Sequence, residues 1–311
     1  MEFQNAHILS AQQLNTEDIE KILRIAVELE PIAQKKLTSD LLRNKVLAAL
    51  FYEPSTRTRL SFETAMNRLG GRVISVVGMD NSSLKKGETL SDTARVISSY
   101  ADVIAMRHPD AGSLTEFSRG ASVPLLNAGD GVNEHPTQAL TDIFTIEKEQ
   151  GRINGLTIAM VGDLKYGRTV HSLSYLLSRF SVKLIFVSPP ELKMPDTVTA
   201  HLREKGVYFD ETQNLEEAIR KSDVLYMTRI QKERFATEAE YRRHHGVYVL
   251  TKGLIERCNQ HILILHPLPR YGEISSEIDE LAGAAYFRQV ENAVAVRMAL
   301  LYLLLGDGDN D

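Results

Sequence analysis

Cysteine is nearly absent from this chain of 311 residues, in which Cys258 is the single thiol. One thiol excludes an internal disulfide and any metal site built from several cysteines, and it favours a reducing compartment such as the cytoplasm. No apolar run approaches ~18 uninterrupted residues, so we expect no membrane-spanning segment and no membrane partner. Residues 1–7 carry neither a basic nor an apolar segment, so we expect no secretory signal.

An excess of positive charge is also missing. The chain has 36 Lys and Arg against 41 Asp and Glu, which gives a formal net charge of −5. Because nucleic-acid-binding proteins usually carry a basic surface, this balance argues against nucleic acid as a partner. It still allows a locally basic pocket for a small anion. The length favours two domains, and a composition of 43% hydrophobic and 25% charged residues is typical of globular proteins.

Apolar runs of strand length alternate with amphipathic stretches of helix length. This alternation predicts an α/β fold in which each of two domains has a mainly parallel sheet flanked by helices. The expected strands are residues 45–52, 72–77, 102–106, 123–126, 156–161, 182–187, 223–227 and 262–265. The expected helices are residues 17–36 (after Thr16 as N-cap), 57–69, 89–100, 136–150, 168–180, 214–221 and 290–305.

A turn-rich segment, residues 151–155, separates the first series of strands and helices from a second. We therefore expect one domain to comprise residues 1–135 together with 290–311, because the apolar last helix is long enough to return to it. The other domain comprises residues 150–289, and the helix 136–149 connects the two.

Ligands of open α/β sheets bind beyond the carboxyl ends of the strands, so the loops that follow strands are candidate sites. The loop after the first strand opens a helix with Ser55, Thr56, Arg57 and Thr58. Hydroxyl groups, a helix N-terminus and a guanidinium together suit the oxygens of a phosphate. The alternative is a capped helix with a surface arginine.

Three further loops offer single candidates. Arg107 follows the third strand, where a lone arginine is most often a solvated charge. His135 precedes Pro136 at a helix start, where a neutral imidazole could donate to a carbonyl oxygen or serve a structural role. After the last strand, the prolines at 267 and 269 leave the carbonyls of Pro267 and Leu268 available as acceptors.

Arginine recurs after the strands, at Arg57, Arg107, Arg168, Arg229 and Arg270. No acid pair, metal-ligand cluster or Ser-His-Asp arrangement accompanies these arginines, so we expect neither a metal nor a cofactor. Residues 162–169 lack the G-x-G-x-x-G spacing, which disfavours a dinucleotide. The pattern predicts a ligand with several negative charges and catalysis by positioning and charge stabilisation.

Residues 55–59 (STRTR), 135–138 (HPTQ) and 266–270 (HPLPR) resemble motifs of the aspartate/ornithine carbamoyltransferase family. Residues 162–173 and 227–234 resemble, within that family, the catalytic chains that use aspartate. The matches run in the family's order from about Lys45 to Leu305. The resemblance implies an enzyme that transfers the carbamoyl group of carbamoyl phosphate to the amino group of L-aspartate. The products are N-carbamoyl-L-aspartate and phosphate, and the reaction is the committed step of de novo pyrimidine biosynthesis.

The resemblance also implies roles for residues. Residues 1–135 with 290–311 would bind carbamoyl phosphate, residues 150–289 would bind aspartate, and the active site would lie in the cleft between the two domains. The residues for carbamoyl phosphate would be Ser55, Thr56, Arg57, Thr58, Arg107, His135, Gln138, Pro267, Leu268 and Pro269, among which Arg57, Thr58, Arg107 and His135 are the catalytic ones. The residues for aspartate would be Lys86, Arg168, Arg229 and Gln231. The base that deprotonates the amine stays open, with the departing phosphate as one candidate.

The resemblance further implies a homotrimer with shared active sites. Residues 82–88 would reach into the neighbouring subunit's site with Ser82 and Lys86, while Ser83 or Lys85 could act instead. A regulatory chain or a dihydroorotase could associate. The alternatives to aspartate transfer are ornithine or putrescine as acceptor and a binding protein without catalysis. Ornithine enzymes typically carry His-Cys-Leu-Pro, where this chain has His-Pro-Leu-Pro followed by Arg270.

Overall fold

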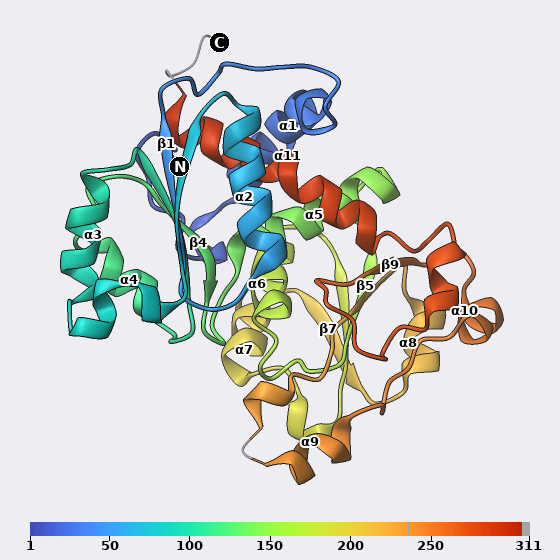
Figure 1. The fold of residues 1–311 in the computed structure, drawn as a ribbon. Coiled ribbons are helices and arrows are strands. Elements are labelled where there is room, and N and C mark those ends of the chain that lie inside the picture. Colours follow the sequence, from blue (N-terminus) through green and yellow to red (C-terminus); the bar gives the residue numbers. More distant parts are fainter. Residues whose placement is uncertain (236, 307–311) are drawn as a thin grey trace. The chain divides into compact units, whose positions relative to one another are not determined.

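The computed structural model describes residues 1–235 and 237–306 (Figure 1). The chain divides into two compact units. Unit 1 comprises Met1–Thr141 and the C-terminal segment from Val290, and unit 2 comprises Asp142–Gln289. The division falls inside helix α5 (Pro136–Gln150), which overlaps the helix expected to connect two domains. Residues 307–311 of the expected first domain lie outside the described residues.

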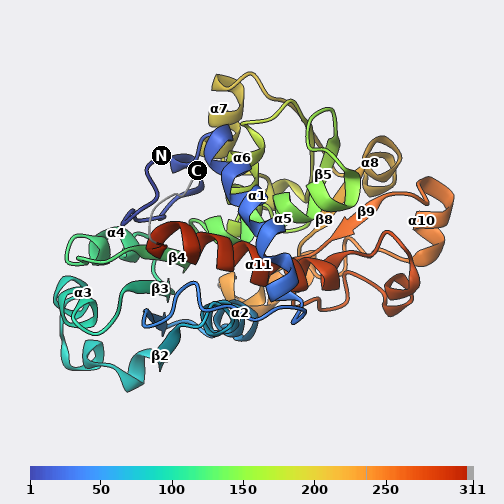
Figure 2. The same cartoon turned by 90° about the horizontal axis from the view of Figure 1, so that it is seen from above.

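Unit 1 contains a four-stranded parallel sheet with the order β2-β1-β3-β4. Its strands are β1 (Val46–Phe51), β2 (Arg72–Val77), β3 (Val103–His108) and β4 (Leu125–Asp130). Helix α2 (Thr56–Arg68) packs on β1 and β2. Helices α3 (Leu90–Ser98) and α4 (Ser113–Ser118) lie side by side on the other face (Figures 1 and 2). Because both faces are covered, the inner strands are buried, as their near-continuous apolar residues predict.

Unit 2 contains a five-stranded parallel sheet with the order β7-β6-β5-β8-β9. Its strands are β5 (Thr157–Val161), β6 (Lys183–Val187), β7 (Tyr208–Thr212), β8 (Val224–Met227) and β9 (Leu263–Leu265). Its helices are α6 (Arg168–Leu177), α7 (Asp196–Glu204), α8 (Leu215–Lys221), α9 (Glu238–His244) and α10 (Lys252–Cys258). The predicted fold class, two parallel sheets flanked by helices, is therefore confirmed.

Two long helices complete the fold. Helix α1 (Thr16–Ala33) is capped by Asn15 rather than by Thr16, because the Asn15 side chain accepts from the Asp18 N–H and the Asp18 carboxylate accepts from the Asn15 N–H. Helix α11 (Tyr286–Leu305) starts in unit 2 and belongs to unit 1 from Val290 onward. Short 3₁₀ helices are η1 (Ala11–Gln13), η2 (Met79–Asn81), η3 (Ser83–Lys86), η4 (Pro190–Leu192), η5 (Lys232–Arg234) and η6 (Ser276–Glu280). Among the described residues, no helix has the length and apolar character needed to span a bilayer.

Strand β4 extends beyond the predicted strand 123–126, because it continues to Asp130 and is buried throughout. The N-terminal segment provides the missing partners. Ile8 forms a parallel bridge with Leu126, and the Asn127 side chain donates to the Leu9 carbonyl over 2.7 Å. A segment more than a hundred residues away therefore pairs with β4, where the strand continues past the predicted end at residue 126.

In both sheets the order of the strands reverses at one point. In unit 1 the chain passes from β1 outward to β2 and then returns to place β3 on the other side of β1. In unit 2 it passes from β5 to β6 and β7 before β8 pairs with the free side of β5. Such switch points open a crevice at the carboxyl ends of the two strands, where doubly wound proteins bind ligands. The loops after β1, β3, β5 and β8 are therefore the loops to inspect.

Candidate active site

The first predicted loop starts helix α2 at the switch point of unit 1. Ser55 is the N-cap residue with an extended backbone (φ −159°, ψ 106°), yet its side chain makes no capping hydrogen bond. The N-cap side chains of other helices do bond to the backbone; these are Asn15, Thr89, Asn214, Thr237 and Thr251. The Ser55 hydroxyl is thus not used as a cap, and a helix start that carries hydroxyl groups is suited to an anion.

Thr58, in the first turn of α2, connects this loop to the start of α5. Its hydroxyl lies 3.5 Å from Nε2 of His135, and both residues are buried. The other ring nitrogen of His135, Nδ1, lies 3.5 Å from the Thr137 hydroxyl. Gln138 donates its backbone N–H to the His135 carbonyl over 3.0 Å. His135 therefore directly precedes α5, and Gln138 lies in its first turn. Hydroxyl and imidazole groups therefore meet beside the helix start that suits an anion.

Arg107 lies at the end of β3, directly opposite Phe51 at the end of β1. Its carbonyl accepts from the Tyr52 N–H over 2.9 Å, and its Nε lies 2.9 Å from a carboxylate oxygen of Glu53. Arg107 therefore lies at the carboxyl ends of the strands, as does the start of α2. Sequence reasoning missed Glu53, although an acid directly after the first strand is a visible signal.

A neutral histidine supports the end of β3. His108 is buried, and burial lowers the pKa of its imidazole. Its Nδ1 accepts from the Asp110 N–H over 3.1 Å and lies 2.9 Å from the Ser113 hydroxyl, while its ring meets that of Tyr52 edge to face. Burial also raises the pKa of Tyr52 to about 12. The groups behind Arg107 are thus uncharged, which leaves the arginine as the local cation on this strand end.

Glu134, next to His135, is a second residue that sequence reasoning missed. Its carboxylate accepts from the Ser10 hydroxyl at 2.5 Å and from the Ala11 N–H at 2.7 Å. The residue is 5% exposed. The N-terminal segment therefore anchors the residue that precedes the predicted catalytic histidine, and no local sequence signal could have revealed a partner so distant in the chain.

In unit 2, the loops after β5 and β8 approach each other closely at the switch point. Gly162, with φ +119°, lies so near the Thr228 carbonyl that a Cβ would come within 2.3 Å of the oxygen, which explains the glycine. Arg229 follows Thr228 and is half-buried, and Arg168 starts α6. The Gln231 side chain donates to the Tyr166 carbonyl over 3.0 Å. These loops thus meet at the carboxyl ends of β5 and β8. They carry the three residues predicted for the acceptor, Arg168, Arg229 and Gln231.

A buried carboxylate joins these two loops. Asp163 accepts from the Tyr166 N–H over 2.9 Å and, at 3.5 Å, from the Gln231 N–H. Burial raises the pKa of Asp163 to about 6, although the surrounding N–H groups and Arg229 oppose that change. The loop that carries Arg229 and Gln231 therefore rests on a carboxylate that titrates near neutral pH.

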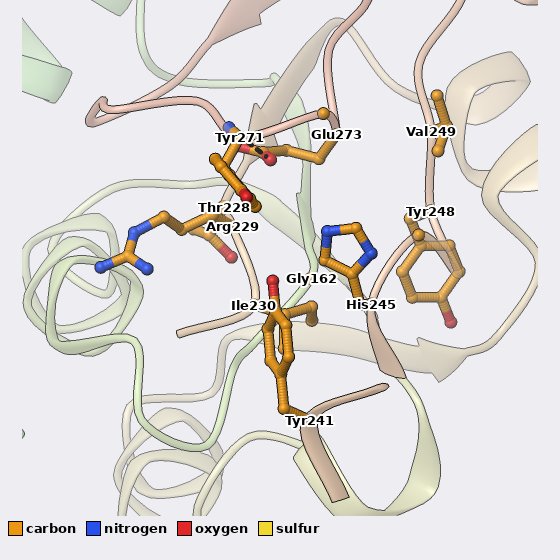
Figure 3. Close-up of a pocket in the computed structure, with 12 residues that line it drawn as sticks. Gly162, Thr228, Arg229, Ile230, Tyr241, His245, Tyr248, Val249, Tyr271 and Glu273 are labelled. Carbon is orange, nitrogen blue, oxygen red and sulfur yellow. Dashed lines mark hydrogen bonds between the residues drawn. The ribbon is translucent and has the colours of Figure 1, made fainter. Parts of the chain in front are cut away.

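A cavity of about 130 Å³ lies beside Arg229 (Figure 3). Tyr241, His245, Tyr271 and Glu273 contribute to its lining. In Figure 3 the Arg229 guanidinium points away from the rings of Tyr241 and His245. The cavity is thus a neighbour of the predicted acceptor site, and its aromatic residues were not predicted.

The turn after β9 carries the predicted acceptors Pro267 and Leu268, which are half-buried, and Pro269, which is exposed. The expectation that Arg270 adds a cation for the ligand is wrong in this structure. Its guanidinium forms two bonds with the Asp279 carboxylate, one of them 2.6 Å long, and also contacts the Tyr286 hydroxyl. Arg270 therefore connects the turn after β9 to η6 and α11 through these bonds.

The predicted residues accordingly form two groups, each at the switch point of its own sheet. Unit 1 holds Ser55, Thr56, Arg57, Thr58, Arg107, His135 and Gln138, and unit 2 holds Arg168, Arg229 and Gln231, with Pro267–Pro269 after the neighbouring strand β9. Ser82 and Lys86 stand apart, in the segment after the edge strand β2. Across residues 1–235 and 237–306, no group of three His, Cys, Asp or Glu side chains could hold a metal ion.

Two family models match the chain, one for each half. Residues 6–148 match the model described as "Aspartate/ornithine carbamoyltransferase, carbamoyl-P binding domain". Residues 154–304 match the model described as "Aspartate/ornithine carbamoyltransferase, Asp/Orn binding domain". The two sets of strand-end residues fall one in each matched region.

Individual relatives cover nearly the whole chain. The aspartate carbamoyltransferase catalytic subunit of Thermococcus kodakarensis is 49% identical over 306 residues, which are 98% of this chain and 99% of that protein. The multifunctional protein CAD of Squalus acanthias is 48% identical over 98% of this chain, which corresponds to 14% of that longer protein. Among solved structures, aspartate transcarbamoylase from Trypanosoma cruzi in complex with carbamoyl phosphate and aspartate gives a TM-score of 0.93 at 41% identity and covers 98% of both chains. The chain belongs to the aspartate/ornithine carbamoyltransferase family.

Proposed function

We propose that the chain is the catalytic chain of an aspartate carbamoyltransferase, which transfers the carbamoyl group of carbamoyl phosphate to the amino group of L-aspartate. The observation that carries this proposal is the placement of two different anion sites at two switch points. The start of α2 offers hydroxyls, N–H groups and an arginine to a phosphate. The loops after β5 and β8 offer two arginines to carboxylates.

Donor binding is assigned to unit 1. Ser55, Thr56, Arg57 and Thr58 surround the phosphate, and the carbamoyl oxygen faces Thr58, Arg107 and His135. The carbamoyl NH₂ donates to Gln138 and to the carbonyls of the turn Pro267–Pro269. The 3.5 Å separation of Thr58 and His135 supports a shared ligand oxygen, because both side chains are buried and turned to each other. Glu53 pairs with Arg107, so the substrate oxygen competes with this carboxylate for the guanidinium.

The reaction is an acyl transfer without a covalent enzyme intermediate. The amino nitrogen of aspartate attacks the carbamoyl carbon and forms the new C–N bond. Charge that develops on the carbamoyl oxygen is stabilised by Thr58, Arg107 and His135. The bond from the carbon to the bridging phosphate oxygen then breaks, and that electron pair leaves with phosphate. The amine proton goes to a base, for which the departing phosphate is one candidate.

The acceptor is assigned by charge. Arg168 and Arg229, together with Gln231 and Lys86 of a neighbouring subunit, suit the two carboxylates of aspartate. Ornithine carries an ammonium group at its far end, which requires an acceptor group instead. Asp163 is the buried acid of these loops, and its oxygens already accept backbone N–H groups. The loops after β5 and β8 therefore favour a dianionic acceptor.

The test is turnover by the purified chain with carbamoyl phosphate, offered L-aspartate and L-ornithine in parallel, with detection of the carbamoylated amine. We expect product from aspartate alone. Product from ornithine alone would mean that the acceptor assignment is wrong. Binding of carbamoyl phosphate without product from either amine would indicate a binding protein without catalysis.

Association into a homotrimer with shared sites is part of the proposal. The edge strand β2 exposes Ile74 and Val77, and Met79 follows it, with 41%, 40% and 38% of their surfaces exposed. An exposed apolar edge favours contact with another chain. The adjacent segment carries Lys86, which is exposed and makes no ion pair within the described residues, whereas Lys85 pairs with Asp80 at 3.0 Å. This difference supports Lys86 as the residue that enters the neighbouring site.

Shared sites are tested by mixing two inactive variants. Lys86→Gln removes the lent residue, and His135→Ala removes a residue of the receiving subunit. A mixed trimer contains some sites built from one intact chain on each side, so mixing the two variants should restore part of the turnover. No recovery after verified exchange of chains would exclude a shared site.

The trimer is expected in the cytoplasm. Its reaction would be the committed step of de novo pyrimidine biosynthesis. A regulatory chain or a dihydroorotase would be a further partner.

A further inference from the structure

A buried histidine holds the turn whose carbonyl groups are assigned to the carbamoyl NH₂. His266 follows β9 directly and is 1% exposed. Its Nδ1 accepts the N–H of Leu268 over 2.7 Å. Leu268 has φ +52°, in the left-handed region that a residue with a Cβ adopts at a cost of about 1 kcal/mol or more. The bond to His266 compensates for part of that cost.

The same bond fixes the direction of a carbonyl. The N–H of Leu268 and the carbonyl of Pro267 belong to one peptide plane, and in a planar peptide the two groups point in opposite directions. Because the N–H points to the buried ring of His266, the Pro267 carbonyl points away from that ring. Rotation of this peptide would break the 2.7 Å bond and redirect the carbonyl.

A carboxylate keeps the ring in the required tautomer. The Nε2 of His266 lies 2.7 Å from Oε1 of Glu273, and Oε2 of Glu273 accepts the Tyr271 N–H over 2.8 Å. Burial is the largest single influence and would raise the pKa of Glu273, but the bond to His266, its charge interaction and the backbone N–H groups together lower the pKa, so the group is a carboxylate and accepts. The proton of the neutral imidazole is therefore on Nε2, which leaves Nδ1 free to accept from Leu268.

The ring is also held through its backbone. The His266 N–H donates to Oε1 of Gln289 over 3.0 Å, and the Gln289 amide donates to Asp142 over 2.6 Å. Asp142 accepts in addition from the Tyr226 hydroxyl over 2.8 Å. These groups are buried, so the position of His266 is set from both sides by hydrogen bonds within unit 2.

We propose that His266 and Glu273 are positioning residues for carbamoyl transfer: Glu273 holds the proton on Nε2, and Nδ1 then orients the Pro267 carbonyl to accept from the carbamoyl NH₂. This inference rests on the proposed function. It assigns to His266 a role in recognising the amino group of the donor, in addition to any contribution to folding.

The test compares carbamoyl phosphate with acetyl phosphate, in which a methyl group replaces the NH₂. An oriented carbonyl acceptor gives a preference for the amino compound, because the methyl compound leaves it unpaired. His266→Asn places an amide oxygen near the position of Nδ1 and retains the acceptor. His266→Gln places its amide near Nε2 and loses the acceptor. Affinities of both phosphates are measured by calorimetry for the wild type and the two variants.

We expect His266→Gln to reduce the preference for carbamoyl over acetyl phosphate by about fivefold, which corresponds to one hydrogen bond, and His266→Asn to retain most of it. Equal weakening of both phosphates in His266→Gln would show a structural role alone and overturn the proposal, as would an unchanged preference. Failure of the wild type to bind carbamoyl phosphate would instead refute the proposed function.

A second measurement requires no variant and so does not depend on whether a variant folds. In NMR spectra of wild-type protein labelled with ¹⁵N-histidine, the ¹⁵N chemical shifts of the His266 ring should show a protonated Nε2 and an unprotonated Nδ1 at neutral pH. A proton on Nδ1 would place two N–H groups against each other and would overturn the proposal.

Discussion

The two units place the groups proposed to bind anions at equivalent points of their sheets, but these groups differ in kind. In unit 1 the start of α2 provides short donors, namely hydroxyls and helix N–H groups, from one stretch of chain. In unit 2 the N-cap of α6 is Gly167, which has no hydroxyl, and the donors are the long side chains Arg168 and Arg229 from two loops. Short convergent donors match the tetrahedral oxygens of phosphate, whereas separate guanidinium groups match two planar carboxylates.

The support behind the two sites differs as well. Behind Arg107, the buried groups are a tyrosine and a histidine, and burial shifts the pKa of each in the direction that keeps it neutral. Behind Arg229, the support is Asp163, a carboxylate with a pKa of about 6. The groups behind Arg107 should therefore be insensitive to pH near neutrality, while the acceptor loop should respond to it. The predictions below test that contrast, beginning with the largest expected effect.

Replacing His135 should affect the chemical step, because its proposed role is to stabilise charge that develops during the reaction. His135→Ala is expected to reduce kcat by roughly 10- to 1000-fold, as for loss of one oxyanion donor. Steady-state turnover at saturating concentrations of both substrates checks this. His261→Ala, at an exposed position, serves as the control and should leave kcat unchanged. Turnover of His135→Ala near the wild-type rate would remove this role.

Replacing Arg229 should damage the use of aspartate while sparing the donor. Arg229→Ala should reduce kcat/KM for aspartate by about 100-fold, because two hydrogen bonds between charged groups are lost. The affinity for carbamoyl phosphate, measured without aspartate, should stay within about twofold of wild type, since a change of that size is below one hydrogen bond. Arg243→Ala, on the exposed face of α9, is the matched control. An unchanged KM for aspartate would contradict the proposed role of Arg229 in binding the carboxylates of aspartate. It would also remove the contrast between the two units.

Replacing Ser55 tests whether its hydroxyl serves a ligand or the helix. Ser55→Ala should weaken phosphate and carbamoyl phosphate binding by about fivefold without a loss of stability, because the side chain does not cap α2. Asn214→Ala is the opposite case, since that side chain does cap α8 and should cost about 1 kcal/mol of stability with no change in affinity. Calorimetric affinities and thermal unfolding of both variants separate the two roles. A stability loss in Ser55→Ala without an affinity change would assign Ser55 to the helix.

The sequence was sufficient for elements whose signal is local. Every expected strand overlaps an observed one, since buried parallel strands read as continuous apolar runs. Strand β7 was missed because it lies at an edge and consists of Tyr208–Thr212, whose mostly exposed positions require no apolar pattern. The strand-end rule placed Arg107 and Arg229 correctly at the switch points. Side-chain partners outside a single helix or strand were out of reach: Glu134 bonds to Ser10, far away in the chain, and Arg270 bonds to Asp279 across a turn.

The smallest expected effect on ligand binding concerns Asp163 and pH. The pKa of about 6 in the folded chain is above the ordinary value of 3.8, so the folded state favours the protonated carboxyl. Burial of the charged form therefore reduces stability above pH ~6, by about 3 kcal/mol, and this cost fades as the pH falls from ~6 toward ~3.8. Asp163→Asn, which is never charged, should accordingly be more stable than wild type at pH 7.

Function should change in the opposite direction, because only the carboxylate offers acceptors to the N–H groups of both Tyr166 and Gln231. Asp163→Asn should bind aspartate about two- to threefold more weakly at pH 7.5, an effect of about half a kcal/mol. Wild-type affinity should fall toward that of the variant as the pH drops below ~6, because protonation of the buried carboxyl removes the same acceptor. Titrations of aspartate from pH 5 to 8 on both proteins, with unfolding followed in parallel, measure this. If the ratio of the two affinities stays constant across this range, Asp163 does not control the acceptor loop, and the pH contrast between the units is lost.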